Sequence, residues 1–215
     1  MNFRYAIFDL DGTLLDTQKH WERVEREVLG KRFGIDMFND ENGNYIQYNG
    51  LRAMIEYAMK LTGKTISLEE ILDELYDVMR DIYKSGDIDT MPKALRFLKA
   101  LKAEGIKTAL ATATDIDVCK PALERMGLLP YLDELVCTSY VGKNKYHPDV
   151  FDKAMELIGG NKEETMVFED ALYAANTLKA NGYRYTIIEE EGNLCCRDEL
   201  KDGCENYIKS YEELL

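Results

Sequence analysis

Residues 4–17 read Arg4-Tyr5-Ala6-Ile7-Phe8-Asp9-Leu10-Asp11-Gly12-Thr13-Leu14-Leu15-Asp16-Thr17. The apolar run 5–8 is rich in strand-forming residues and predicts a buried β-strand. Two aspartates follow it, so the strand brings acidic side chains to the edge of a sheet, where ligands bind in open α/β folds. Asp9 and Asp11 would share a face if the strand continued, and paired carboxylates are seldom left without a counter-charge. Mg²⁺ is the simplest neutraliser, because it is commonly held by carboxylates and phosphate oxygens.

This stretch resembles motif I, Asp-x-Asp-Gly-Thr, of the haloacid dehalogenase (HAD) superfamily of phosphotransferases. The match covers Asp9, Asp11, Gly12 and Thr13. The alternative interpretation is a strand end followed by an Asx-rich turn. A bare Asp-x-Asp would favour that alternative, whereas the longer match behind an apolar strand favours the motif.

Composition limits the class of protein and its partners. The 215 residues suffice for one domain with a substantial insert, or for two small domains. The net charge of −13 disfavours nucleic acid as a partner, because phosphate backbones require a basic surface. The same net charge is compatible with a small phosphorylated metabolite as partner, since one local cation site overcomes the repulsion from a distant negative surface. We expect a monomer or a weak homodimer.

The five cysteines are scattered and odd in number. With no secretory signal ahead of them, we expect reduced thiols in a cytoplasmic protein. Cys195-Cys196 with Cys204 lacks the usual C-x-x-C geometry and a nearby histidine, so a metal site there is weakly indicated. No apolar stretch approaches the length of a membrane span, and we expect no membrane association.

A helical block follows the first strand. Helical spacing of apolar residues recurs from Trp21 to Leu29 and from Leu51 to Leu61, and a further helix follows the N-cap Ser67. The interval 34–50 is rich in asparagine and glycine and predicts a loop. The resemblance implies that residues 17–87 form an inserted helical cap of the C1 type, with hinges at 16–18 and 84–90. A closing cap would exclude water from a phosphoryl enzyme.

The remainder alternates helices with apolar strands. Helical patterns begin after Pro92, at Val118 and at Phe151, and residues 189–203 predict a polar loop. Apolar runs predict strands at residues 106–112, 135–138, 165–168 and 185–188, with a short edge strand at 207–208. The pattern and the resemblance together predict an α/β fold: a Rossmann-like, doubly wound parallel sheet as the HAD core, made of residues 1–16 and 88–215.

Three further segments resemble the remaining HAD motifs in order. The strand ending at Thr112 resembles motif II, and the resemblance implies that its hydroxyl and the backbone N–H groups from Ala113 onward hold a phosphoryl oxygen. Lys145, at a fixed offset from Pro148-Asp149, resembles the motif III lysine; Lys143 is the nearby alternative. Its ammonium would neutralise phosphoryl charge beside the nucleophile.

Glu169 and Asp170 resemble motif IV, which completes the magnesium site. An apolar strand again ends in acids with no local cation to pair them. The resemblance implies that Asp170 is a direct ligand and Glu169 either a ligand or a group supporting one. With Asp9 and Asp11 they form the expected metal set.

Within the cap, Gly50 and Arg52 are the candidates for substrate binding. They lie where this family often places its specificity loop. Arg52 is suited to bidentate binding of a substrate anion, and a solvated surface arginine is the alternative.

The resemblance implies a Mg²⁺-dependent phosphatase acting on a small organic phosphate. Asp9 would attack phosphorus and form an aspartyl-phosphate, and Asp11 would serve as acid and then base. One alternative is a phosphosugar mutase of the β-phosphoglucomutase type, which carries a histidine ten residues after the second aspartate. Here that position is Trp21, with His20 one residue, about 100°, away around a helix. Dehalogenation fits less well, and a catalytically idle binding protein on a HAD scaffold is the remaining alternative.

Overall fold

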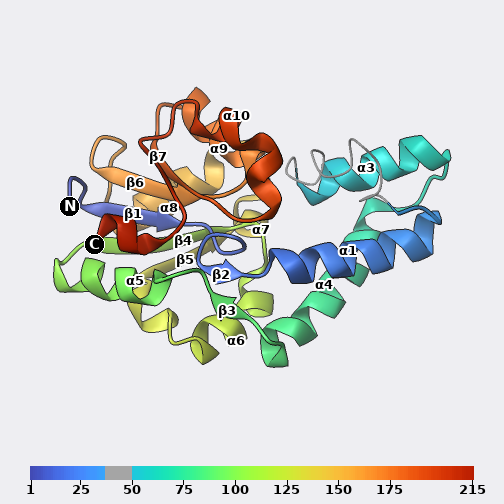
Figure 1. The fold of residues 1–215 in the computed structure, drawn as a ribbon, viewed down its shortest axis with the longest axis horizontal. Helices are drawn as coiled ribbons and strands as arrows, with labels where there is room; N and C mark the ends of the chain where they lie inside the picture. The colour runs from blue at the N-terminus through green and yellow to red at the C-terminus, as the bar shows by residue number, and fades with distance from the viewer. Residues whose placement is uncertain (37–49) are drawn as a thin grey trace.

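A parallel six-stranded sheet forms the centre of the protein (Figure 1). The computed structural model describes residues 1–36 and 50–215. The strand order is β5-β4-β1-β6-β7-β8, and every neighbouring pair in it is parallel. The strands are β1 (Tyr5–Phe8), β4 (Lys107–Thr112), β5 (Glu134–Cys137), β6 (Thr165–Glu169), β7 (Arg184–Ile188) and β8 (Asn206–Ile208). The predicted edge strand at 207–208 is therefore confirmed.

Helices cover both faces of the sheet, as expected for a doubly wound fold. One face carries α5 (Ala94–Ala103), α6 (Ile116–Arg125) and the 3₁₀ turns η2 (Leu129–Tyr131) and η4 (Tyr211–Leu214). The other carries α8 (Asp149–Ile158), α9 (Leu172–Ala180) and α10 (Arg197–Lys201). The short helix α7 (Thr138–Val141) follows β5.

Side chains alternate between these two layers along each central strand. In β1, Phe8 packs into the cluster with α5 and α6, while Ile7 packs into the cluster with α8 and α9. Phe8 stacks on Phe168 of β6, with ring centroids 4.6 Å apart. Because both faces are apolar, the strands read as continuous hydrophobic runs, which is typical of a buried parallel sheet.

The helical block lies beside the sheet, between two short strands. β2 (Leu15–Asp16) and β3 (Asp89–Thr90) pair antiparallel, so the chain leaves and re-enters the core at adjacent points. In the described part of this segment the helices are α1 (Gln18–Phe33), α3 (Leu51–Thr62) and α4 (Leu68–Ser85) (Figure 1). α4 packs against α6 of the core, and one apolar cluster runs through both. The division into domains at 17–87 stays a prediction, and most of the predicted loop 34–50 lies outside the described residues.

One segment differs from the expectation. Residues 189–203 were expected to be a polar loop, but they contain the 3₁₀ turn η3 (Gly192–Cys196) and the helix α10. The buried side chains of Asn193, Cys196 and Leu200 anchor this segment to the core. Elements of five residues are too short to show a helical period, so the pattern alone does not reveal them.

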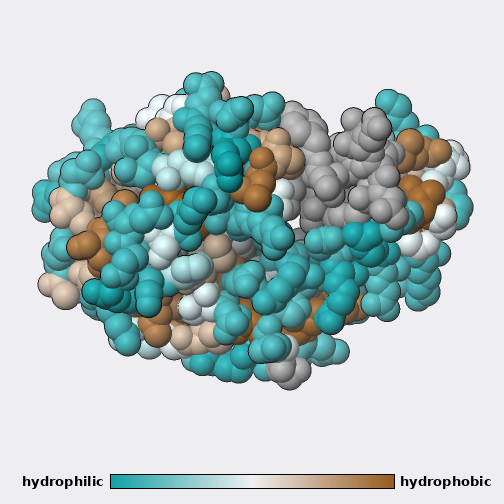
Figure 2. All heavy atoms as spheres, in the orientation of Figure 1, coloured by the Kyte–Doolittle hydropathy of each residue, from teal (hydrophilic) through white to brown (hydrophobic). Residues whose placement is uncertain are grey.

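The surface agrees with the strongly charged composition. Figure 2 shows a face on which hydrophilic residues predominate and exposed apolar residues are scattered. Within the described part of the chain, no helix combines the length and apolarity that spanning a bilayer requires.

Candidate active site

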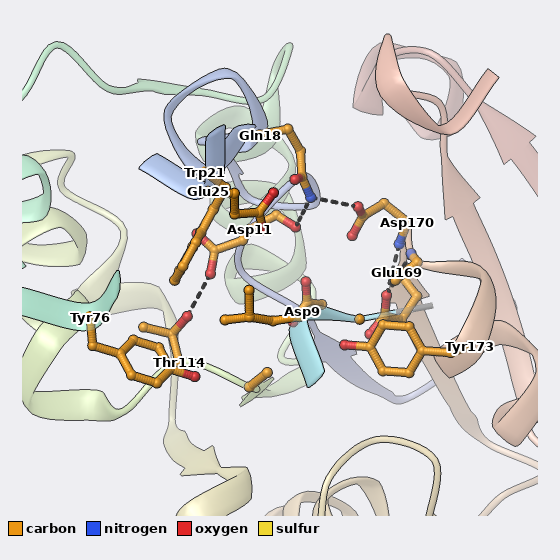
Figure 3. A pocket seen from close by; sticks show the side chains of 14 residues that line it. Asp9, Asp11, Gln18, Trp21, Glu25, Tyr76, Thr114, Glu169, Asp170 and Tyr173 are labelled. Atoms are coloured by element: carbon orange, nitrogen blue, oxygen red, sulfur yellow. Dashed lines mark hydrogen bonds between the residues drawn. The ribbon is translucent and has the colours of Figure 1, made fainter. Parts of the chain in front are cut away.

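Three carboxylates from two neighbouring strands meet at the carboxyl edge of the sheet (Figure 3). Asp9 follows β1, Glu169 ends β6, and Asp170 comes directly after it. One oxygen from each lies within 4.8 Å of the others, and all three residues are buried. Because β1 and β6 are adjacent and parallel, acids 160 residues apart in the chain are brought to one point.

Lys145 lies beneath this cluster and pairs with two of its members. Its ammonium nitrogen Nζ donates to Oδ1 of Asp9 and lies 2.5 Å from Oε1 of Glu169. The lysine side chain is 2% exposed. Burial opposes its charge, but Asp9 and Glu169 outweigh that cost and keep the pKa of Lys145 above its ordinary value. The alternative, Lys143, is half exposed and pairs with Asp149 instead, 2.9 Å away.

Burial also governs the protonation of the acids. It raises the pKa of Asp9 to about 7, although Lys145 acts in the opposite direction, and Glu169 and Asp11 raise the pKa further. The pKa of Asp170 is likewise raised, first by burial and then by Glu169 and Asp9. A single lysine therefore does not neutralise the cluster, and a second cation would relieve it.

Hydroxyl groups hold the carboxylate of Asp11 in a fixed orientation. Oδ1 accepts a hydrogen bond from Thr17 at 2.6 Å and another from Tyr83 on α4. Oδ2 accepts from Thr114 at 2.8 Å. The side chain of Asp11 thus faces these hydroxyls, and Tyr83 ties the helical block to the loop after β1.

The main-chain carbonyl of Asp11 takes a different direction, toward Asp170. The amide nitrogen of Gln18 lies 3.3 Å from that carbonyl and 3.1 Å from Oδ2 of Asp170. Thr13 donates to the second Asp170 oxygen, Oδ1, at 3.0 Å. Gly12, with φ +82°, is required here because a Cβ would clash with the Asp170 carboxylate.

These donors fit a hard divalent cation. Asp9, Asp170 and the carbonyl of Asp11 supply oxygen atoms only, the ligand type that Mg²⁺ prefers. Glu169 is held by the ammonium of Lys145 at Oε1 and by the N–H groups of Asp170 and Ala171 at Oε2. The described donors to the Asp170 carboxylate are the neutral side chains of Thr13 and Gln18, so among the described residues Asp170 has no cation of its own and fits direct ligation better than Glu169 does.

Of the four other residues predicted to bind substrate, two line the cavity beside the acids and two do not. A cavity of about 140 Å³ adjoins the acids, and Ala113 and Gly50 line it. Thr112, at the end of β4, is fully buried, and its hydroxyl accepts the N–H of Thr114 at 3.0 Å. Arg52 lies in a neighbouring hollow, exposed and paired with Glu56 at 2.9 Å. The substrate-binding roles of these four residues stay predictions.

Other lining residues were not anticipated as part of a site. Four of them come from three different helices: Trp21 and Glu25 of α1, Tyr76 of α4, and Tyr173 of α9. Asn193 of η3 supports the site from behind, because its amide donates to the carbonyls of Asp170 and Ile188. Of these residues, only Glu25 stands out in the sequence as a candidate site residue, because it is charged and lies on the same helix face as the apolar positions 21, 24, 28 and 29.

The chain belongs to the haloacid dehalogenase-like hydrolases, whose family model matches residues 3–182. It is similar to a phosphoglycolate phosphatase of Aquifex aeolicus, with 26% identity covering 78% of this chain and 76% of that protein. It is also 26% identical to a fructose-1-phosphate phosphatase of Escherichia coli, covering 83% and 94% respectively. The crystal structure of CbbY from Rhodobacter sphaeroides in complex with phosphate shares the fold, with a TM-score of 0.79, 21% identity and coverage of 99% and 96%.

Proposed function

We propose that this protein is a Mg²⁺-dependent phosphatase that hydrolyses a small organic phosphate monoester through an aspartyl-phosphate on Asp9. The observation that carries the proposal is the buried convergence of Asp9, Glu169 and Asp170 over Lys145. Burying each of these charges costs several kcal/mol, on the order of the whole stability of a domain. A purely structural role therefore does not explain why so many charged side chains are buried together. Relatives named as phosphatases of small phosphate esters agree with this function.

In the first step, Asp9 acts as the nucleophile. Lys145 holds Oδ1, and we assign the attack to Oδ2. The new bond joins Oδ2 to phosphorus, and the bond from phosphorus to the substrate oxygen breaks. Asp11, oriented by its hydroxyl donors, enters this step protonated in the substrate complex and gives its proton to that departing oxygen.

In the second step, the aspartyl-phosphate is hydrolysed. Asp11 takes a proton from a water molecule, whose oxygen attacks phosphorus. The bond to Asp9 breaks, phosphate leaves, and both carboxyl groups return to their starting states. Asp9, Asp170 and the carbonyl of Asp11 would hold Mg²⁺. Its positive charge would offset the repulsion between the carboxylate of Asp9 and the phosphate dianion of the substrate.

The mutase alternative receives less support. Trp21 occupies the cavity wall at the position where that class carries histidine. His20 points elsewhere, with Nε2 2.9 Å from the carbonyl oxygen of Asp87.

Hydrolysis of p-nitrophenyl phosphate with and without Mg²⁺ tests the proposal. The wild type should release nitrophenol only with the metal, and D9N should lose more than about 10³-fold in kcat, since it lacks the nucleophile. D73N, an exposed aspartate on α4, is the matched control and should behave as wild type. Wild-type rates in D9N, or no metal-dependent hydrolysis by the wild type, would refute the proposal.

A further inference from the structure

One side-chain amide bridges two residues of the proposed metal site. The nitrogen Nε2 of Gln18 lies 3.3 Å from the main-chain oxygen of Asp11 and 3.1 Å from Oδ2 of Asp170. Figure 3 shows both contacts, which reach into the cavity from the first residue of α1. Because a main-chain carbonyl only accepts hydrogen bonds, the amide must face it with its nitrogen, whose two N–H groups serve one oxygen each.

Gln18 supplies positive charge where the structure otherwise provides little. Asp170 is 1% exposed, and its described side-chain donors are both neutral: Thr13 donates to Oδ1 at 3.0 Å and Gln18 to Oδ2. Asp9 and Glu169, by contrast, share the ammonium of Lys145. A buried carboxylate is costly without a partner, and the N–H groups of an amide reduce that cost.

A metal ion that binds these oxygens competes with the amide. Mg²⁺ takes oxygen ligands at about 2.1 Å and needs their lone pairs, which the N–H groups of Gln18 also use. The positive ends of those N–H groups would repel an ion held by the same two oxygens. Both contacts of Gln18 are also longer than the roughly 2.8 Å of a strong charge-assisted hydrogen bond, so they are readily exchanged.

The side chain of Gln18 has space into which it can turn. Besides the active-site cavity, it lines a second hollow of about 440 Å³, together with Lys19 and Glu22 of α1. The backbone of α1 need not move, because the carbonyl of Thr17 accepts the N–H groups of His20 and Trp21 at 2.9 and 3.0 Å. Rotation about the side-chain bonds of Gln18 is sufficient to release both oxygens.

We infer that the amide of Gln18 stands in for the metal ion between Asp11 and Asp170 in the metal-free protein and is displaced when the ion binds. This inference concerns the metal site of the proposed phosphatase and rests on that function. Gln18 is then a positioning residue: it keeps the two ligands ordered while the site is empty, and it lowers the affinity for the ion. Metal binding also releases one contact between α1 and the loop after β1.

The metal affinity of the variant Q18A tests the inference without an activity measurement. Mn²⁺, which suits the same oxygen ligands as Mg²⁺, is titrated into metal-free protein, and the free ion is followed by electron paramagnetic resonance. Loss of the competing amide should tighten Mn²⁺ binding roughly 3- to 30-fold, the range of one hydrogen bond. Q18N, whose amide is one methylene too short, should behave alike. E27A, an exposed residue on α1, is the control and should keep the wild-type affinity.

Thermal unfolding gives the matching comparison of the two states. Q18A should lower the Tm of the metal-free protein by roughly 2–6 °C, because that state uses the amide contacts. At saturating Mg²⁺ its Tm should equal that of the wild type, since the contacts are already broken there. If Gln18 instead supported the ligands in the loaded site, Q18A would lower Tm in both states and weaken metal binding.

The outcomes separate this inference from the phosphatase proposal. Unchanged or weaker Mn²⁺ binding by Q18A, or the same loss of Tm with and without Mg²⁺, overturns this inference alone. If Q18A does not fold, the same measurements on Q18N decide. A wild type that binds no Mn²⁺ and shows no Mg²⁺-dependent hydrolysis of p-nitrophenyl phosphate overturns the phosphatase function, and this inference with it.

Discussion

The phenol of Tyr83, near the end of α4, donates a hydrogen bond to Oδ1 of Asp11, in the loop after β1. The two residues are 72 positions apart, and α1, α3 and most of α4 lie between them in the chain. Tyr83 is fully buried, and burial is the first of the causes that raise its pKa well above the ordinary value, so it remains a donor throughout the working pH range. The proposed acid–base group is thus positioned partly by helix α4 of the helical block.

Removing this contact should reduce catalysis while leaving the fold intact. Y83F deletes one hydroxyl donor, but Thr17 and Thr114 still hold the carboxylate of Asp11. We expect kcat to fall about tenfold, in line with roughly 1.5 kcal/mol for a hydrogen bond to a charged group, with KM little changed. The pH profile of kcat should also shift, which a purely structural role would not cause. Y140F, an exposed tyrosine on α7, is the control, and an unaltered kcat and pH profile in Y83F would contradict the positioning role.

Lys145 should matter for stability as well as for activity. K145M leaves Asp9 and Glu169 buried without their shared cation, which typically costs about 3–5 kcal/mol of unfolding free energy. Urea unfolding of the metal-free protein measures this loss. The double variant K145M/E169Q removes one uncompensated charge, and it should recover part of the stability but none of the activity. Equal stability of K145M and wild type would mean that the buried pair is not formed.

Metal binding should depend on pH in a defined direction. Because the pKa of Asp9 is raised to about 7 in the metal-free fold, its folded state holds a proton that the unfolded chain loses near pH 4. The stability that this group contributes is full below about pH 4 and is lost as the pH rises through 7. Mg²⁺ binds the ionised form, so we expect the metal to raise Tm more at pH 8 than at pH 5. D170N should reduce the Tm increase at pH 8, and a Mg²⁺ effect independent of pH would contradict this linkage.

Asp133 gives the opposite pH dependence, away from the active site. Burial opposes its charge, but the N–H of Thr108 at 2.9 Å and the ammonium of Lys102 at 3.3 Å outweigh burial and lower its pKa. This contribution to stability is present above the ordinary aspartate pKa, about 3.9, and is lost as the pH falls through the lower folded value. D133N keeps an acceptor for Thr108, and its unfolding free energy should depend less on pH in the acid range. The same acid-range slope in D133N and wild type would show that Asp133 is not so stabilised.

Sequence patterns predicted those parts of the site that lie at strand ends. Asp9 and Glu169 each follow an apolar run directly and Asp170 comes next, so their meeting at one edge of a parallel sheet could be predicted from topology. Lys145 was chosen over Lys143 from its spacing to Pro148-Asp149, and its position beneath the acids agrees with that choice.

The donors around the acids could not be predicted in the same way. Tyr83, Thr114 and Asn193 are common residue types, and the aspartates to which they donate, Asp11 and Asp170, are 23 to 103 positions away. Their roles depend on how α4, the loop after β4 and η3 pack against the sheet, which no local pattern specifies. Among the lining residues that were not anticipated, Glu25 alone gave a signal in the sequence, because a charged residue within an apolar helix face contradicts simple amphipathic packing.

The account's central claim is that Asp9 forms a covalent phosphoryl intermediate. The most direct measurement is to mix enzyme, Mg²⁺ and p-nitrophenyl phosphate, quench in acid within milliseconds, and reduce the acyl-phosphate with borohydride before peptide mass spectrometry. We predict that homoserine replaces aspartate at position 9, and that the product is absent in D9N and without substrate. Turnover of the substrate with unmodified Asp9, or with the modification at another residue, would contradict the account.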